Sequence, residues 1–128
     1  MNTWTPDELA QIANTDEMHI AGRRRDGTDR KPVIVWMVRL GDEIYTRSVN
    51  GPHAAWFRGT RARHEGHIIV DNLDKYVAFV DIEADDPIND ALDAAYRSKY
   101  RRYAEPVASI TSELARSTTL KLVPQQNN

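Results

Sequence analysis

One segment constrains the fold more than any other: residues 33–40, VIVWMVRL, are apolar at almost every position. Such a run predicts a β-strand covered on both faces, because a strand with one exposed face would carry polar residues at alternate positions. Two turn residues, Gly41 and Asp42, follow it, and residues 43–48 are then expected to form a half-buried partner strand. The chain is therefore expected to fold around a β-hairpin at residues 33–48.

The remaining pattern predicts more short strands and several helices. Further strands are expected at residues 18–21, 67–70, 76–82 and 118–123. Helices are expected at residues 6–13, 54–62, 86–103 and 105–116, the first capped by Thr5 and the third by Asp86. Hairpins outnumber strand–helix–strand units, so we predict an α+β fold, a six-stranded barrel or curled sheet flanked by helices, over a doubly wound sheet.

Length and composition narrow the class of protein. The 128 residues are expected to form one domain over residues 1–124 with a disordered tail at residues 125–128. The absence of cysteine excludes disulfides, thiol catalysis and cysteine-ligated metals. The chain contains no apolar run of the ~20 residues that span a bilayer, and its start does not resemble a secretory signal. A cytoplasmic protein without a membrane partner is expected.

Charge is strongly segregated along the chain. Residues 20–64 hold ten basic and four acidic side chains, whereas residues 65–96 hold one basic and nine acidic side chains, and the net charge is −2. Helix capping and the helix dipole account for much of the acidic stretch, including Asp90 and Asp93. A nucleic-acid-binding module would usually be basic overall, so no nucleic-acid partner is expected and a smaller anion fits the basic stretch better.

The most informative loop is residues 22–30, which contains two glycines, four arginines and Thr28. Glycine permits unusual backbone angles, and neighbouring N–H groups and arginine forks can together hold an anion. One interpretation is a phosphate cradle for a nucleotide-like cofactor. The alternative is a solvated basic loop in which Asp26 and Asp29 form local ion pairs.

A second candidate is residues 48–58, which leave a strand through a Gly-Pro turn and enter a helix. Trp56 could line a flat ring system there, although adjacent aromatic residues at the start of a helix more often pack in the core. The four histidines lack the spacing of a metal site, and no metal is expected. No nucleophile or general base stands out, so an enzyme of this kind would depend on a cofactor.

Three segments carry a resemblance to a known group: GRRRDGTDRKP at residues 22–32, WMVRLGDEIY at residues 36–45, and residues 48–58 with their AWFR sequence. They resemble the deazaflavin-dependent nitroreductase group of flavin-binding split barrels. Nearly the whole chain, including residues 94–100 and 115–120, is closer to an uncharacterised bacterial family, a domain of unknown function similar to those barrels. The resemblance implies a six-stranded split β-barrel flanked by helices.

The resemblance also implies a site. FMN or a deazaflavin coenzyme would be the cofactor, its phosphate held by Arg24, Arg25 and Arg30. The residues that would approach the cofactor or shape its pocket are Trp36, Ser48, Asn50, Gly51, His53 and Trp56. One departure from the group's pattern is Asp26, which places a carboxylate beside the proposed phosphate.

Two functions follow. In the first, the protein is a homodimeric oxidoreductase that transfers hydride to a small organic substrate. In the second, it is a non-catalytic split barrel that binds a small anionic ligand or a protein partner. The helix expected at residues 86–103 has no counterpart in the nitroreductase group, and it would cover the pocket or form a dimer face.

Overall fold

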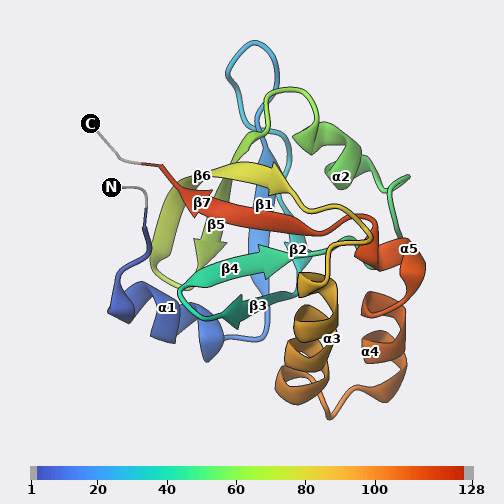
Figure 1. Cartoon of the computed structure of the whole chain (residues 1–128). Helices are drawn as coiled ribbons and strands as arrows, with labels where there is room; N and C mark the ends of the chain where they lie inside the picture. Colours follow the sequence, from blue (N-terminus) through green and yellow to red (C-terminus); the bar gives the residue numbers. More distant parts are fainter. Residues whose placement is uncertain (1–2, 126–128) are drawn as a thin grey trace.

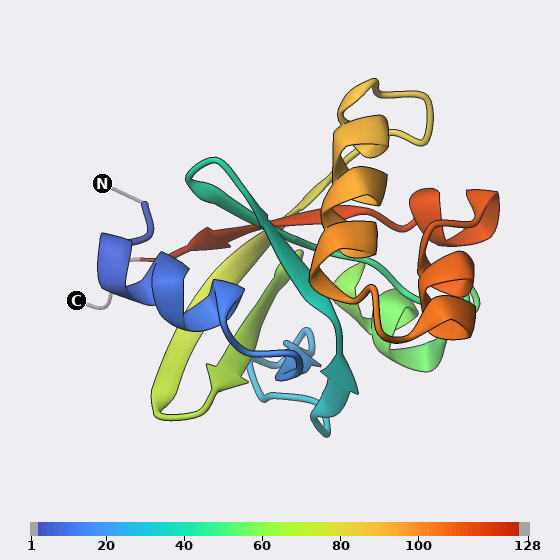
Figure 2. The ribbon, with the colours of Figure 1, turned by 90° about the horizontal axis from the view of Figure 1, so that it is seen from below.

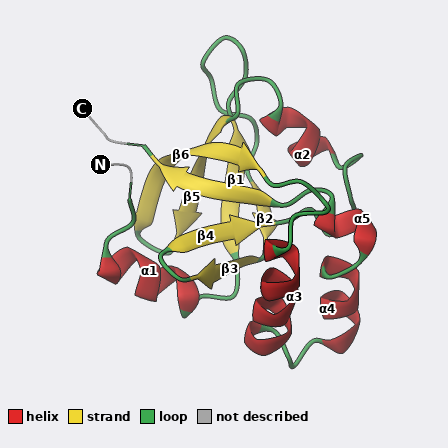
Figure 3. Ribbon diagram, viewed as in Figure 1, coloured by secondary structure: helices red, strands yellow, loops and turns green. Residues whose placement is uncertain are grey.

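The computed structural model describes residues 3–125, which form an antiparallel seven-stranded sheet curled into a nearly closed barrel with helices around it (Figures 1 and 3). The strands are β1 (Met18–Gly22), β2 (Val33–Val35), β3 (Met37–Leu40), β4 (Glu43–Thr46), β5 (Glu65–Val70), β6 (Leu73–Asp81) and β7 (Leu120–Pro124). The helices are α1 (Pro6–Ala13), α2 (Ala55–Thr60), α3 (Ile88–Lys99), α4 (Ala104–Ile110) and α5 (Glu113–Arg116).

The apolar segment at residues 33–40 forms two strands, and the prediction of six strands is therefore wrong. The sheet order is β2-β1-β5-β6-β7-β4-β3, so β2 and β3 are its two ends. Trp36 lies between them, and its carbonyl accepts a hydrogen bond from the Thr46 hydroxyl at 2.6 Å. Coverage of both faces holds only in part: Val35, Met37 and Val38 are buried, whereas Ile34 in β2 is 55% exposed.

The other expected strands are confirmed, with shifts of a few residues at their ends. The β3–β4 hairpin turns at Gly41, whose φ is +60°, and β5 and β6 form a second hairpin. In α1 the Thr5 hydroxyl accepts from the Glu8 N–H at 3.2 Å and the Glu8 carboxylate accepts from the Thr5 N–H at 2.9 Å, which confirms the capping box.

Two helix predictions need correction. Pro87 occupies the N-cap position of α3, although Asp86 still accepts a hydrogen bond from the Ile88 N–H at 2.9 Å. The single helix expected at residues 105–116 is two helices, α4 and α5. The second begins where the Ser112 hydroxyl accepts from the Ala115 N–H, because a serine side chain at this position caps a new helix.

Two hydrophobic clusters stabilise the fold. One fills the barrel and includes Ile12, Ile20, Phe79 and Leu122. The other lies between the barrel and the α3–α4 pair, which stand side by side against one flank of the barrel (Figure 2); it consists of Val38, Tyr45, Leu92, Tyr96, Tyr100, Val107 and Ile110. The apolar stripe of α3 is thus buried against the barrel.

The last described residue lies beside β6. Gln125, the first residue of the expected tail, donates its backbone N–H to the Tyr76 carbonyl at 2.9 Å, and residues 126–128 lie outside the described residues. Within residues 3–125, every helix is too short or too polar to cross a lipid bilayer.

Candidate functional site

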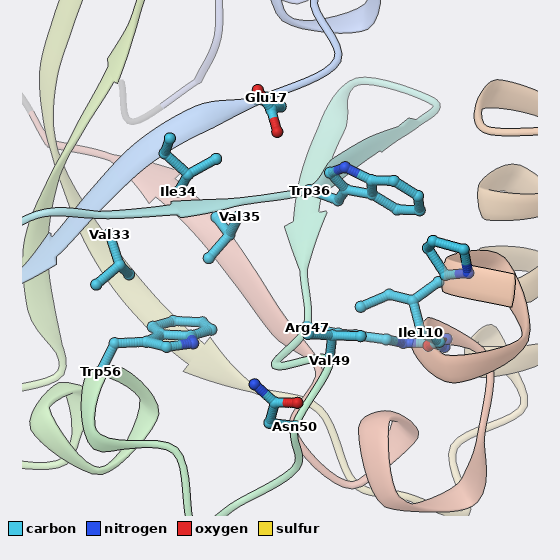
Figure 4. A pocket seen from close by; sticks show the side chains of 11 residues that line it. Glu17, Val33, Ile34, Val35, Trp36, Arg47, Val49, Asn50, Trp56 and Ile110 are labelled. Carbon is cyan, nitrogen blue, oxygen red and sulfur yellow. The ribbon is translucent and has the colours of Figure 1, made fainter. Parts of the chain in front are cut away.

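A cavity of about 460 Å³ opens between β2, α2 and α4 (Figure 4). We call it the tryptophan cavity, and its lining residues are Glu17, Val33, Ile34, Val35, Trp36, Arg47, Val49, Asn50, Trp56, Pro106 and Ile110. Trp56 lies beside Val33 and Val35, while Ile110 lies across the cavity from it (Figure 4). Most of the walls are apolar, as in sites that bind small organic molecules.

Aromatic neighbours fix both tryptophans. The Trp36 ring stacks on Tyr100 with a centroid distance of 3.9 Å and an interplanar angle of 3°. The Tyr100 hydroxyl in turn accepts from the Met37 N–H at 3.1 Å and lies 2.7 Å from the Asp16 carbonyl. Burial raises the pKa of Tyr100, so its hydroxyl keeps its proton at neutral pH. Trp56 meets Phe57 edge-on, with their centroids 6.0 Å apart. The two indole rings therefore form rigid walls.

Arg47 forms the buried base of the tryptophan cavity. Its guanidinium donates to the Asp93 carboxylate at 2.6 Å and to the Ile110 carbonyl at 3.1 Å. It also donates to the Asn89 side chain at 3.0 Å and to the Thr119 hydroxyl at 3.0 Å. The side chain has no exposed surface. Arg47, directly after β4, thus ties this end of the strand to α3, to α4 and to Thr119 directly before β7, and its charge is neutralised within the protein.

A second cavity, of about 400 Å³, lies against another face of α2. Four arginines line it: Arg25 and Arg30 from the loop after β1, and Arg58 and Arg61 from α2 and the residue that follows it. The other lining residues, Ala55, Gly59 and Ala62, are small. Residues 55, 58, 59 and 62 share one face of a helix, whereas Trp56 points into the tryptophan cavity. We call the second cavity the arginine cavity.

Only part of the arginine-rich loop faces this cavity. Arg24 turns back into the loop and donates to the Asp29 carbonyl at 2.7 Å. Asp26 accepts hydrogen bonds from the Thr28 hydroxyl at 2.7 Å and N–H at 3.0 Å, and these bonds hold the pKa of its carboxyl below the ordinary value. Neither residue lines the arginine cavity. The carboxylate of Asp26 is therefore occupied by its own turn.

Only some of the residues proposed in the segment 48–58 line a cavity. Asn50 and Trp56 line the tryptophan cavity, whereas Ser48, Gly51 and His53 lie outside both cavities. Ser48 is buried and its N–H donates to the Thr118 hydroxyl at 2.8 Å. His53 is exposed.

Gly51 has a structural role in this segment. Its φ of +84° is one that side chains rarely adopt, and a Cβ there would come within 2.5 Å of the Leu114 side chain. The glycine therefore permits the close approach of the α5 residue Leu114 to the turn that carries Asn50.

Several residues of the two cavities were absent from the site expected from the sequence, among them Arg47 and Arg58, and so was Asp93, which lines neither cavity but pairs with Arg47. Asp93, attributed to the helix dipole, is the buried partner of Arg47, and it also pairs with Arg116 at 3.2 Å. The half-buried strand expected at residues 43–48 is wrong in its burial, because residues 44–48 are all buried, and the local pattern gave no signal for Arg47. Arg58 follows the helical spacing of Ala55 and Gly59. No group of three His, Asp or Glu side chains within residues 3–125 is arranged to hold a metal ion.

A family model described as "Uncharacterized protein conserved in bacteria (DUF2255)" matches residues 8–122. The chain belongs to this family. The expected relation to an uncharacterised bacterial family is thereby confirmed, and DUF2255 is that family. No curated protein matches the chain at the level of sequence.

Solved structures share the fold of this DUF2255 chain at low sequence identity. The heme storage protein HutZ from Vibrio cholerae has a TM-score of 0.66 and 11% identity, covering 95% of this chain and 90% of its own. The FAD and heme binding protein from Mycobacterium smegmatis has a TM-score of 0.61 and 16% identity, covering 94% and 65%. Campylobacter jejuni ChuZ has a TM-score of 0.59 and 12% identity, covering 93% and 51%. The chain thus spans less than two thirds of the last two proteins, and the similarity establishes the barrel fold.

Proposed function

We propose that the protein binds a flavin or deazaflavin cofactor, with the ring in the tryptophan cavity and the phosphate in the arginine cavity. One observation carries the proposal: the short helix α2 borders both an aromatic-walled cavity and a cavity lined by arginines. A cofactor with a flat ring and an anionic tail needs both surfaces within the length of one small molecule.

The residues present fit such a group. The volume of the tryptophan cavity, about 460 Å³, lies within the range of roughly 300–1,000 Å³ typical of small-molecule sites. Trp36 and Trp56 supply aromatic walls, and Asn50 supplies hydrogen-bonding groups at the edge of the cavity. Arg25 and Arg30 bring forked donors suited to phosphate. The descriptions of two proteins with this fold, as a heme storage protein and an FAD and heme binding protein, support a cofactor site on such a barrel.

A bound flavin or deazaflavin would supply hydride transfer, which fits an oxidoreductase acting on a small organic substrate. The protein itself would position the cofactor and the substrate and would exclude water. The stack of Trp36 on Tyr100 fixes one wall of the cavity, and the buried Arg47–Asp93 pair fixes its base. Ser48, Gly51 and His53, proposed from the family resemblance to approach the cofactor, belong to the turn that carries Asn50.

We also expect a homodimer, from the resemblance to the split-barrel group. Two exposed apolar side chains at the rim of the tryptophan cavity, Ile34 and Val49, suit burial against a second copy. A dimer of this kind would close the cavity and shield the ring from water.

The proposal is tested by titrating the protein separately with FMN and with a deazaflavin coenzyme, following ligand fluorescence and melting temperature. Saturable binding with a rising melting temperature is expected for one of them. The double variant Arg25→Ala/Arg30→Ala should weaken this binding by at least ~10-fold. It should change the free energy of unfolding by less than about 1 kcal/mol, because both side chains are partly or fully exposed and lack ion-pair partners in the described chain.

The matched control is Arg97→Ala/Arg101→Ala, which removes the same charge from a cavity between α3 and α4. This control should bind the cofactor like the wild type. Equal losses in the two double variants would show that net charge alone drives binding. Failure of both cofactors to bind the wild-type protein would contradict the proposal.

The second candidate function is a non-catalytic barrel that binds a small anion in the arginine cavity. It is favoured by the arrangement of that cavity, which has four arginines and no acidic side chain among its lining residues. Saturable binding of inorganic phosphate without binding of either cofactor would select this function.

A further inference from the structure

The thirteen arginines of the chain divide by whether their side chains have partners. Eight form a side-chain hydrogen bond or an ion pair: Arg23, Arg24, Arg39, Arg47, Arg61, Arg63, Arg102 and Arg116. Within residues 3–125, the other five make neither kind of contact: Arg25, Arg30, Arg58, Arg97 and Arg101. Three of those five, Arg25, Arg30 and Arg58, line the arginine cavity.

These three guanidinium groups face one space without a counter-charge. The cavity measures about 400 Å³, and its fourth arginine, Arg61, is already neutralised by Asp81 at 2.6 Å. The lining includes no carboxylate. Three like charges around one small cavity repel one another and raise the local concentration of anions. The arrangement therefore favours a ligand with several negative charges.

The cavity is also built to keep these arginines together. Arg30 lies directly on α2 at Gly59, where a Cβ would come within 2.5 Å of the arginine Nε. Arg58 belongs to the same helix. The neighbouring lining residues Ala55 and Ala62 have small side chains that occupy little of the cavity. Loop and helix thus each contribute guanidinium groups to one site.

The number of donor groups points beyond a single phosphate. An arginine fork can bind two oxygens of a phosphate side by side, and three forks can bind more oxygens than the three that a phosphate monoester offers. We infer that the arginine cavity binds a diphosphate group, with Arg58 as the third ligand beside Arg25 and Arg30. This inference rests on the proposed function, which places the anionic end of a cofactor in the arginine cavity. It narrows the cofactor to a class that carries a diphosphate, as dinucleotides do.

The first test uses inorganic phosphate and pyrophosphate, titrated calorimetrically into the whole protein at constant ionic strength and without divalent metals. Pyrophosphate should bind about 10-fold more tightly than phosphate. Arg58→Ala should lower the affinity for pyrophosphate about 10-fold and that for phosphate less than about 3-fold. The matched control Arg97→Ala removes an equally unpaired arginine and should leave both affinities unchanged.

The second test compares riboflavin, FMN and FAD, which share a ring and carry no phosphate, one phosphate and a diphosphate. Affinity should increase in that order, and Arg58→Ala should reduce it most for FAD. Equal binding of all three flavins would retain the ring site and overturn the diphosphate site. Preference for pyrophosphate with no flavin binding would retain the diphosphate site and overturn the proposed cofactor. Equal affinities for phosphate and pyrophosphate, no binding of either anion, or equal effects of Arg58→Ala and Arg97→Ala would overturn the inference.

Discussion

Arg47 and the arginines of the arginine cavity are the same residue type in opposite environments. Arg47 is fully buried at the base of the tryptophan cavity, and its guanidinium donates to Asp93, Asn89, Ile110 and Thr119. Arg25, Arg30 and Arg58 lie around a cavity without a protein partner in the described chain. The difference separates structural from binding roles: an arginine whose donors are all used by the protein stabilises the fold, and one that keeps them unused at a cavity can bind a ligand.

The largest expected effect is the loss of the buried carboxylate. Asp93→Ala would leave the Arg47 guanidinium buried without its counter-ion, and breaking a buried ion pair in this way costs about 3–5 kcal/mol. We expect the free energy of unfolding in urea to fall by that amount, with a lower transition midpoint at an unchanged slope.

Asp90→Ala is the control for this comparison. Asp90 pairs with Arg116 at 3.2 Å, but its side chain is 79% exposed, so its loss should cost no more than about 1 kcal/mol. Similar losses for the two variants would mean that burial does not distinguish these ion pairs, and the structural role assigned to Arg47 would be wrong.

Lys99 extends the comparison, because it is a partly buried cation whose hydrogen-bond partners are carbonyl groups. Its Nζ donates to the Met37 carbonyl at 2.8 Å and to the Ile12 carbonyl at 3.2 Å. Burial lowers its pKa from 10.5 to about 8, against the opposing effect of Asp16. Above pH 8 the folded protein has lost a proton that the unfolded chain keeps up to pH 10.5. Stability should therefore rise with pH through this window.

The measurement is the urea transition midpoint between pH 8 and about 9.5. The upper limit avoids the tyrosines, since burial raises the pKa values of Tyr96 and Tyr100 and ionisation of their unfolded forms would lower stability above about pH 10. The effect should be smaller than that of Asp93→Ala, because Lys99 is only partly buried. Lys99→Met should abolish the rise; a rise of the same size in this variant would assign the pH dependence to another group.

These residues also show what the sequence could and could not predict. Local patterns were enough for the β3–β4 hairpin, the Thr5–Glu8 capping box and the α+β class. The break at Trp36 was not predictable, because it depends on which strands lie at the two ends of the sheet, far apart in the chain. The partner of Asp93 was missed for the same reason, since Arg47 lies 46 residues away.

The candidate site was predicted in part for similar physical reasons. Composition identified the arginine-rich loop, and the structure places Arg25 and Arg30 at one cavity and Trp36, Asn50 and Trp56 at another. Composition could not separate these from Arg24, whose donors are used inside the loop. That distinction depends on the direction of each side chain. Arg58 lies at the site only because α2 packs against the arginine-rich loop, which local sequence does not predict.

The smallest expected change in stability is that of Gly59→Ala, a variant that tests anion binding in the arginine cavity with little effect on the fold. The new Cβ would meet Arg30 Nε at 2.5 Å, so the flexible Arg30 side chain has to move away from α2. Alanine favours a helix over glycine by about 1 kcal/mol, which offsets the lost packing, and the free energy of unfolding should change by less than about 1 kcal/mol. Pyrophosphate affinity should nevertheless fall, because one of three guanidinium groups is displaced.

Gly41→Ala is the control. No atom lies near the added Cβ, but alanine is strained at the φ of +60° that Gly41 adopts, so the variant should lower stability by about 1 kcal/mol and leave pyrophosphate binding intact. If Gly59→Ala binds pyrophosphate as tightly as the wild type, the position of Arg30 on α2 is not part of the anion site, and the contrast with Arg47 would rest on Arg25 and Arg58 alone.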